Sequence, residues 1–107
     1  MNKYHIELSD EALEDIENLE EVIIYKFKAP LTAVRYLAGL RAEIKLLSQI
    51  ADALPFYTQP ELKVKYGINT KRINYKEMAV IFTLFDNTVY IHCIKPSKNI
   101  KGLEQDL

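Results

Sequence analysis

The sequence has no tryptophan, one cysteine and three scattered glycines. A single cysteine cannot form an internal disulfide, so nothing in the chain calls for an oxidising compartment and we expect a cytoplasmic protein. Gly39, Gly67 and Gly102 lie too far apart to form a glycine-rich phosphate loop. Because two distant histidines and one cysteine do not have the spacing of metal ligands, we expect no metal and no cofactor.

Long apolar runs are also missing. Charged residues interrupt the N-terminus from Lys3 onward, at Glu7, Asp10 and Glu11, so no stretch there has the length of a signal peptide. No segment approaches the roughly 20 apolar residues that cross a bilayer. We therefore expect neither secretion by this route nor insertion into a membrane.

The composition is that of a folded globular protein, with 49% hydrophobic and 27% charged residues. In 107 residues two domains would each bury too little apolar surface, so we expect one domain over 1–107, with an ordered core from about 3 to 98 and a loosely held tail over 99–107. Residues 1–53 carry six Lys/Arg and ten Asp/Glu, whereas residues 54–107 carry eight and five. The basic second half could face an anion, although an ordinary solvated surface explains it equally well.

The stretch from Lys71 to Lys95 predicts three strands joined by two tight turns, at Lys76-Glu77 and at Asp86-Asn87. The strand over 78–85 is apolar on both of its alternating faces, so both faces must be covered. In the last strand, alternation puts one set of side chains on one face and a second set on the other, and does not say which set meets the helices. The first set is Val89, Ile91 and Cys93, and the second is Tyr90, His92 and Ile94. Pro96 ends the pairing because it has no amide hydrogen to donate.

A strand and a helix precede this region. Tyr4, Ile6 and Leu8 alternate with polar residues, as in a strand with one buried face. Ser9 stands before two acidic residues, which predicts a helix N-terminus. The carboxylates from Asp10 to Glu21 are typical of a solvated helix face. The apolar stripe expected to face the core is Ala12, Leu13, Ile16, Leu19, Ile23 and Phe27.

A second helix follows after Ala29, with Pro30 in its first turn and Thr32 as an alternative cap. Its expected core stripe is Val34, Leu37, Leu40, Ile44 and Leu47, and it ends near Gln49 or Ala51. So short a connection predicts a helical hairpin. The fold class is therefore α+β, in the order β-α-α-β-β-β, with the two-helix hairpin packed on one face of a small antiparallel sheet.

This order of elements, together with several motifs, resembles the RelE/ParE superfamily of toxins from type II toxin–antitoxin modules. The opening Tyr4-x-Ile6-x-Leu8-Ser9-x-x-Ala12-x-x-Asp15-Ile16 looks like the one these toxins share. Pro55 after the second helix, the strand Val80-Ile81-Phe82 and the strand Val89-x-Ile91-x-x-Ile94 fit as well. The resemblance covers roughly residues 3 to 98, and most matching positions are apolar or capping residues.

The resemblance implies a bacterial growth-inhibiting toxin, of the kind that serves plasmid stabilisation. Toxins similar to RelE are nucleases that cut mRNA in the ribosomal A site, whereas those similar to ParE block DNA gyrase. The resemblance also implies a cognate antitoxin that wraps around the toxin with helices and often a strand, in a dimer or a heterotetramer.

Two departures from the pattern of these toxins bear on activity. Their middle strand commonly opens with Tyr-Arg, where this chain has Met78-Ala79, and the basic pair after their last strand is reduced here to Lys98 in Ser97-Lys98-Asn99. We therefore favour a toxin that binds a target such as DNA gyrase. The alternatives are a ribosome-dependent mRNA endoribonuclease, a degenerate toxin without activity, and a small α+β domain of unrelated role. A sequence pI near 6.1 also disfavours the endoribonuclease.

A metal-independent nuclease needs a base and at least one fixed cation. The catalytic candidates are Arg72 and Lys98 for charge, and Tyr75 or His92 for proton transfer. Arg72 is the only arginine after residue 53, and its rigid fork of donors makes it the best candidate for phosphate or partner contact. His92 titrates in a useful range, although a lone strand histidine is more often structural. The further binding candidates are Lys63, Lys65, Lys71 and Lys95.

Two pairs of chemically active residues lie close together in the sequence. Lys63 and Lys65, two residues apart in an extended segment, would point the same way, either to hold a phosphate or to protect an exposed sheet edge. His92 and Cys93 are not expected to act as a nucleophile–base pair, because adjacent strand residues point to opposite faces.

Overall fold

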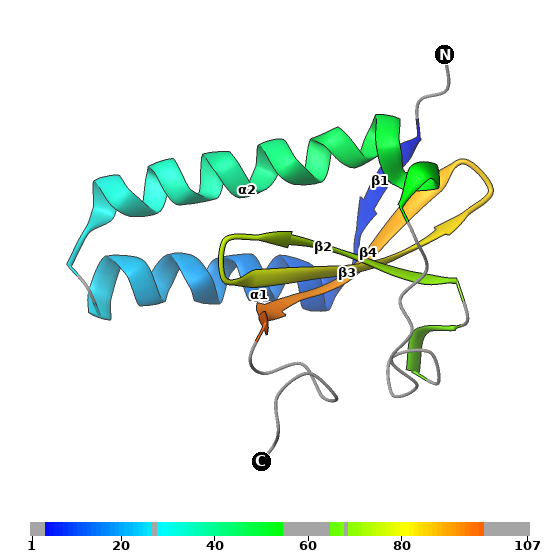
Figure 1. The fold of residues 1–107 in the computed structure, drawn as a ribbon. Coiled ribbons are helices and arrows are strands. Elements are labelled where there is room, and N and C mark those ends of the chain that lie inside the picture. Colours follow the sequence, from blue (N-terminus) through cyan, green and yellow to red (C-terminus); the bar gives the residue numbers. More distant parts are fainter. Residues whose placement is uncertain (1–3, 27, 55–64, 68, 98–107) are drawn as a thin grey trace.

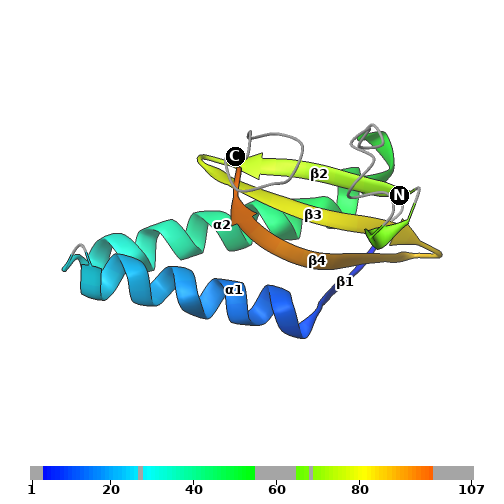
Figure 2. The same ribbon diagram turned by 90° about the horizontal axis from the view of Figure 1, so that it is seen from below.

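Two helices cover one face of a four-stranded sheet in the computed structural model, which describes residues 4–26, 28–54, 65–67 and 69–97 (Figures 1 and 2). The strands lie in the order β1-β4-β3-β2. The α+β class and the order β-α-α-β-β-β are confirmed. Pro55, Lys63, Lys98 and the tail over 99–107 lie outside the described residues.

Strand β1 (His5–Leu8) leads into helix α1 (Asp10–Glu21), which continues as a π-helical segment, η1 (Val22–Lys26). The predicted N-cap is confirmed, because the Ser9 hydroxyl accepts a hydrogen bond of 3.0 Å from the Ala12 amide. β1 pairs with β4 in parallel, so the sheet is mixed rather than wholly antiparallel. The two helices between them supply the long crossover that a parallel pair requires.

Helix α2 (Pro30–Ile50) ends in a 3₁₀ turn, η2 (Ala51–Ala53). Pro30 is its first residue, and no side chain caps it, so Thr32 is not the cap. Two predicted core positions are wrong, because Leu13 and Val34 are 50% and 63% exposed. The stripe that α2 buries begins one residue earlier than predicted and steps by four and three: Ala33, Leu37, Leu40, Ile44 and Leu47.

The predicted three-stranded antiparallel ribbon is confirmed as β2 (Thr70–Tyr75), β3 (Met78–Phe85) and β4 (Thr88–Pro96). Lys76 and Asp86 have positive φ angles of 54° and 56°, as the tight turns require. Met78 to Phe82 are buried without interruption, so both faces of β3 are covered as predicted. The inner face of the sheet, defined by Val80, Phe82, Val89 and Ile91, packs against the helices.

A β-bulge interrupts β4. Ile81 pairs with Cys93 and Phe82 with Ile91, so His92 is an extra residue in the ladder. Beyond the bulge the alternation of faces is shifted. Cys93 packs with Ala79 and Ile81 on the outer face, turned away from the helices, instead of joining Ile91 as predicted. Ile94 accordingly returns to the inner-face core.

Helix α1 takes the place of β1 along the second half of β4. Where β1 ends, the Ser9 amide donates to the Ile91 carbonyl at 2.9 Å and the Ser9 hydroxyl donates to the His92 carbonyl at 2.7 Å. The Asp15 carboxylate then accepts the Ile94 amide at 2.9 Å. The expectation that all carboxylates of α1 are solvated is thus wrong for Asp15, since its side chain is only 9% exposed. Its carboxylate satisfies a strand edge that no neighbouring strand covers.

Candidate functional site

The outer face of the sheet carries three of the predicted site residues: Arg72 on β2, and His92 and Lys95 on β4. Arg72 pairs across the ladder with Ile81, and Lys95 with Ala79, which places both on this face. Their charged groups turn to different partners, so they do not form one cationic cluster. The centre between them is apolar, because Ala79 and Ile81 are fully buried there.

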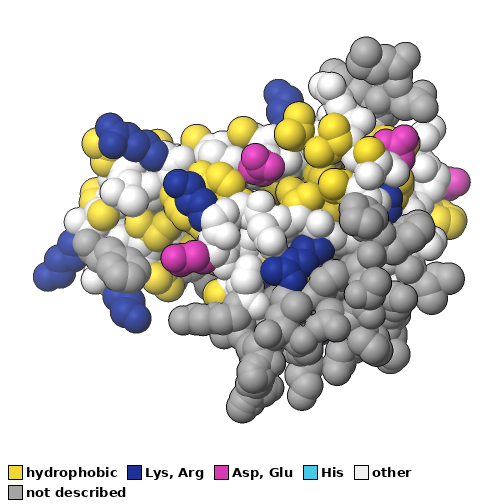
Figure 3. All heavy atoms as spheres, viewed as in Figure 1, with side chains coloured by type: hydrophobic (Ala, Val, Ile, Leu, Met, Phe, Trp, Pro, Cys, Tyr) yellow, Lys and Arg dark blue, Asp and Glu magenta, His cyan; other side chains and the backbone are white. Residues whose placement is uncertain are grey.

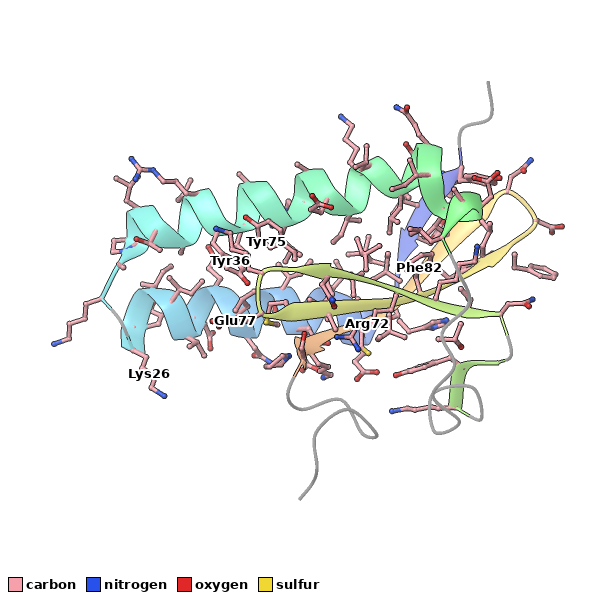
Figure 4. The ribbon with its side chains drawn as sticks, viewed as in Figure 1. Lys26, Tyr36, Arg72, Tyr75, Glu77 and Phe82 are labelled. Carbon is pink, nitrogen blue, oxygen red and sulfur yellow. The ribbon has the colours of Figure 1, made fainter. Side chains whose placement is uncertain are left out.

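Arg72 is held along the outer face. Its Nε donates to the Asn74 side-chain oxygen at 2.8 Å, and its Nη2 donates to the Ser97 hydroxyl at 3.3 Å. The guanidinium therefore connects β2 to the end of β4, and Figure 4 shows it on the side of the sheet away from α2. Arg72 thus lies on the sheet face opposite the helices, and its role in phosphate or partner contact stays a prediction.

Lys95 is neutralised by α1. Its Nζ lies 2.8 Å from the Asp15 carboxylate and 3.2 Å from the Glu11 carboxylate. The hydrogen bond that Lys95 donates to Asp15, reinforced by Glu11, raises the pKa of Lys95 against the opposing effect of burial. With two carboxylates beside one ammonium, this lysine offers little net positive charge to an incoming anion.

His92 sits in a small cluster on the outer face. Its ring stacks on the Tyr66 ring with centroids 4.4 Å apart, and its Nε2 is 3.0 Å from the Thr83 hydroxyl. Burial lowers the pKa of His92, although Glu11 works in the opposite direction. The imidazole is accordingly neutral at pH 7, when it can either donate to or accept from Thr83.

The bulge also places His92 and Cys93 on the same face, so the geometric reason for dismissing them as a pair is wrong. Cys93 is nevertheless a poor nucleophile. It is buried, and burial raises the pKa of its thiol despite the 3.6 Å hydrogen bond from the Tyr66 hydroxyl. A thiol that stays protonated does not attack, so the dismissal stands on its protonation state.

His92 predicts a pH dependence of stability. Because its pKa is lowered in the folded state, the unfolded chain binds a proton first as the pH falls below the ordinary value of 6.5. Stability should therefore decline from pH 6.5 downward, and H92Q should remove that part of the decline. Urea unfolding at pH 7.5 and 5.0 measures it, with H5Q, at an exposed histidine on β1, as the matched control. An unchanged decline in H92Q would contradict the assignment.

Lys71 and Tyr75 lie on the inner face and cannot share a site with Arg72, which corrects two predictions. Lys71 is 4% exposed and donates to the Ala51 carbonyl at the end of α2 at 2.8 Å, and burial lowers its pKa. The Tyr75 ring packs edge-on against Tyr36 of α2, with centroids 5.1 Å apart (Figure 4). The signal was in the sequence, because apolar Ile73 lies between them on the same alternating face.

Lys65 is the described member of the predicted Lys63–Lys65 pair. It is exposed and helical rather than extended, and its ammonium lies 5.3 Å from the centre of the Tyr66 ring. The segment over 65–67 therefore brings one cation and one aromatic ring to the outer face. Lys63 lies outside the described residues, so the predicted pair stays a prediction.

A groove that the sequence reading missed lies on the other side of the molecule, between β1, α1 and α2. It has a volume of about 530 Å³, and the half-exposed Leu13 forms part of its wall. The amides of His5 and Ser9 point toward β4, so those of Ile6 and Leu8 point toward the open edge of β1. Its lining residues are Ile6, Leu8, Leu13, Ile16, Glu17, Arg41, Ile44 and Lys45.

Two further findings concern metal ions and membranes. Among the described residues, no group of three or more His, Cys, Asp or Glu side chains is arranged to hold a metal ion. Within the same part of the chain, neither helix has the length and apolar character needed to cross a membrane.

Two solved structures share this architecture. One is the chromosomal ParDE TA system from P. aeruginosa, with a TM-score of 0.72 and 12% identity over 88% of this chain and 96% of that chain. The other is the toxin–antitoxin complex RelBE2 from Mycobacterium tuberculosis, with a TM-score of 0.52 and 17% identity over 88% of this chain and 98% of that chain. No protein-family model and no curated protein matches the sequence. At these identities the similarity is one of fold.

Proposed function

We propose, from the RelE/ParE-like toxin fold that the chain adopts, that it is the toxin of a type II toxin–antitoxin module and inhibits growth by binding its target. The fold supports toxin–antitoxin membership, because both similar structures are described as toxin–antitoxin systems or complexes. The motifs that resemble this superfamily agree with it. For a toxin that binds instead of cutting RNA, DNA gyrase is the target implied by the resemblance to ParE.

The composition of the outer face supports target binding, rather than RNA cleavage, as the way in which the chain acts. Where toxins of this superfamily commonly carry an arginine, this chain has Ala79, which is fully buried beside Ile81, Cys93 and Tyr66. Lys95 on the same face is neutralised by two carboxylates. A nuclease without a metal needs uncompensated positive charge where the phosphate develops its own, and neither Ala79 nor the paired Lys95 provides it.

One observation favours a ribonuclease as the alternative. Arg72 and the hydrogen-bonded Thr83–His92 pair lie on the same face, which supplies a cation and a neutral imidazole. A neutral imidazole can act as a general base if it lies within hydrogen-bonding reach of the 2′-hydroxyl. Lys63 and Lys98 are the further candidates that the ribonuclease reading would use.

The antitoxin is the partner that we assign to the groove between β1, α1 and α2. The open edge of β1 can pair with an extended segment, and the apolar walls of the groove can take its side chains. Arg41 and Lys45 lie on the α2 side of the groove. Glu17 lies on the α1 side, so the groove favours a segment whose acidic residues face α2, where they complement the charge of Arg41 and Lys45.

The substitution L13D tests the groove. It should weaken antitoxin binding about tenfold or more, because a carboxylate in place of Leu13 removes apolar contact area and must lose hydration when the segment binds. Titration of the purified chain with the product of the adjacent short open reading frame measures the dissociation constant. L46D is the matched control, since Leu46 is 45% exposed on α2 but does not line the groove. Equal affinities of L13D and wild type would place the antitoxin elsewhere.

Growth and two biochemical assays test the function itself. Induction of this chain alone should stop growth, and co-induction of the adjacent open reading frame should restore it. Unimpaired growth in both cases would remove the toxin assignment. The purified chain should inhibit DNA supercoiling by gyrase and leave ribosome-bound mRNA intact. Cleavage of mRNA that is lost in R72K and H92Q would instead establish the ribonuclease.

A further inference from the structure

The helical half of the chain is divided into an acidic part and a basic part. Residues 10–21, which form α1, contain seven Asp/Glu and no Lys or Arg. Residues 22–42 contain four basic residues and no Asp or Glu: Lys26, Lys28, Arg35 and Arg41. The acidic balance of the first half of the sequence conceals this basic segment, which includes the turn between the two helices.

The same turn carries exposed apolar side chains. Tyr25 on η1 and Leu31 and Val34 at the start of α2 are 74%, 60% and 63% exposed. Leu31 and Val34 are three residues apart on a helix and therefore share a face. Isolated exposed apolar residues are ordinary on protein surfaces, but three such residues within ten positions form a cluster. We call residues 22–35 the hairpin tip, with the exception of Phe27, which is not described.

The backbone of the hairpin tip departs from a regular helix. The segment η1 is π-helical. Lys28 has a φ of 53°, a left-handed backbone conformation that glycine and asparagine adopt more readily than lysine. The Ala29 amide closes the turn by donating to the Ile23 carbonyl at 3.3 Å. Both π-helical segments and such left-handed residues are found preferentially at functional sites.

The hairpin tip extends past the end of the sheet. In Figures 1 and 2 the turn between α1 and α2 reaches beyond the hairpin of β2 and β3. In Figure 3 dark-blue Lys and Arg side chains gather with apolar ones at that end of the molecule. It is therefore accessible to a large partner without displacement of any described element. It also lies at the other end of the molecule from residues 65–67, whose Tyr66 stacks on His92.

We propose that the hairpin tip docks onto an acidic surface of the target protein that also exposes an apolar patch. This inference rests on the proposed function, in which the chain acts by binding. The hairpin tip, which contains three basic residues and no Asp or Glu, attracts and orients an acidic protein surface. Tyr25, Leu31 and Val34 then supply apolar area that becomes buried in the contact. A phosphate backbone would use the cations but would leave these apolar side chains without a partner.

Two double variants separate the two parts of the contact. L31S/V34S removes apolar area, whereas K28E/R35E reverses the charge. Both variants should fold, because all four side chains are exposed. L46S is the matched apolar control, about 18 Å further along α2 than Val34 at 1.5 Å per residue. K76E, in the turn between β2 and β3, is the matched charge control. Circular dichroism and thermal unfolding confirm that each variant is folded.

The readout is the number of colonies recovered after induction of the chain without antitoxin. Each tip variant should recover at least ten times more colonies than wild type, whereas L46S and K76E should be as toxic as wild type. A fully toxic L31S/V34S beside an inactive K28E/R35E would overturn the proposal in favour of a nucleic-acid backbone. A fully toxic K28E/R35E would overturn the proposal that the partner surface is acidic. Co-sedimentation of wild type with phosphatidylserine-containing vesicles, lost in both tip variants, would overturn it in favour of a membrane.

These outcomes remain distinct from a failure of the proposed function. If induction of the wild-type chain leaves growth unimpaired, the toxin assignment fails and the docking proposal fails with it. If the wild-type chain is toxic and both tip variants are equally toxic, only the docking proposal is overturned.

Discussion

Replacing Asp15 with alanine is expected to lower the free energy of unfolding by about 2–4 kcal/mol, because the carboxylate satisfies a strand edge and a lysine at once. Its oxygens lie 2.9 Å from the Ile94 amide and 2.8 Å from Lys95 Nζ. Most of the loss should come from the amide, which is left without a partner near the core. Lys95 is 37% exposed and retains Glu11 nearby, so its share is small.

Two further variants separate the amide from the ammonium. D15N keeps an oxygen for the Ile94 amide and removes only the charge, so it should lose less than D15A. K95M removes the ammonium and keeps the amide contact, so it should cost no more than about 1 kcal/mol. Urea unfolding at pH 7 measures all three variants. Equal losses in D15A and K95M would show that the ion pair, and not the strand edge, is what Asp15 stabilises.

Replacing Gly39 with alanine is expected to destabilise the fold by about 1–3 kcal/mol through overpacking. A methyl group at this position of α2 would run into the Tyr75 hydroxyl and the ring carbon that carries it. The sign of the stability change is informative, because alanine in the interior of a helix is otherwise favoured over glycine by about 1 kcal/mol. Stability therefore falls only if the close contact between α2 and β2 outweighs the gain in helix propensity.

A double-mutant cycle checks this contact. Y75F removes the hydroxyl nearest to the added methyl, so the cost of G39A should be smaller in the Y75F background than in wild type. A42G, at an exposed position of the same helix, calibrates the propensity term and should cost about 1 kcal/mol. Thermal and urea unfolding supply the values. A stabilising G39A would mean that α2 and β2 do not approach as closely as described.

The candidate site was only partly predictable from sequence. Arg72 and Lys95 lie on the outer face, but Lys71 and Tyr75 face the helices, as simple alternation around Ile73 indicates. The placement of His92 could not be read from alternation, because a bulge adds one residue to β4 and shifts the faces beyond it. A bulge depends on pairing with another strand, so the sequence of β4 alone carries no signal for it.

The basic hairpin tip, by contrast, was present in the sequence. Residues 22–35 contain three basic residues, Lys26, Lys28 and Arg35, and no Asp or Glu, but the net charge of the whole first half hides them. What needed the structure was the exposure of Leu31 and Val34. Helix α2 has more apolar residues than the sheet can cover. Packing against the sheet therefore decides which of them are buried and which remain exposed.

Local sequence patterns were enough to predict the elements, their order and their turns, since these depend on periodicity, capping and backbone preferences that act within a few residues. They thereby predicted the class of fold. The tertiary structure alone decided that β1 lies parallel to β4, that Asp15 satisfies an edge of β4, and that Lys95 is neutralised while Arg72 stays on the outer face. Each of these joins residues that are distant along the chain. Contacts of that kind arise only when the packed elements bring the residues together, so no local pattern encodes them.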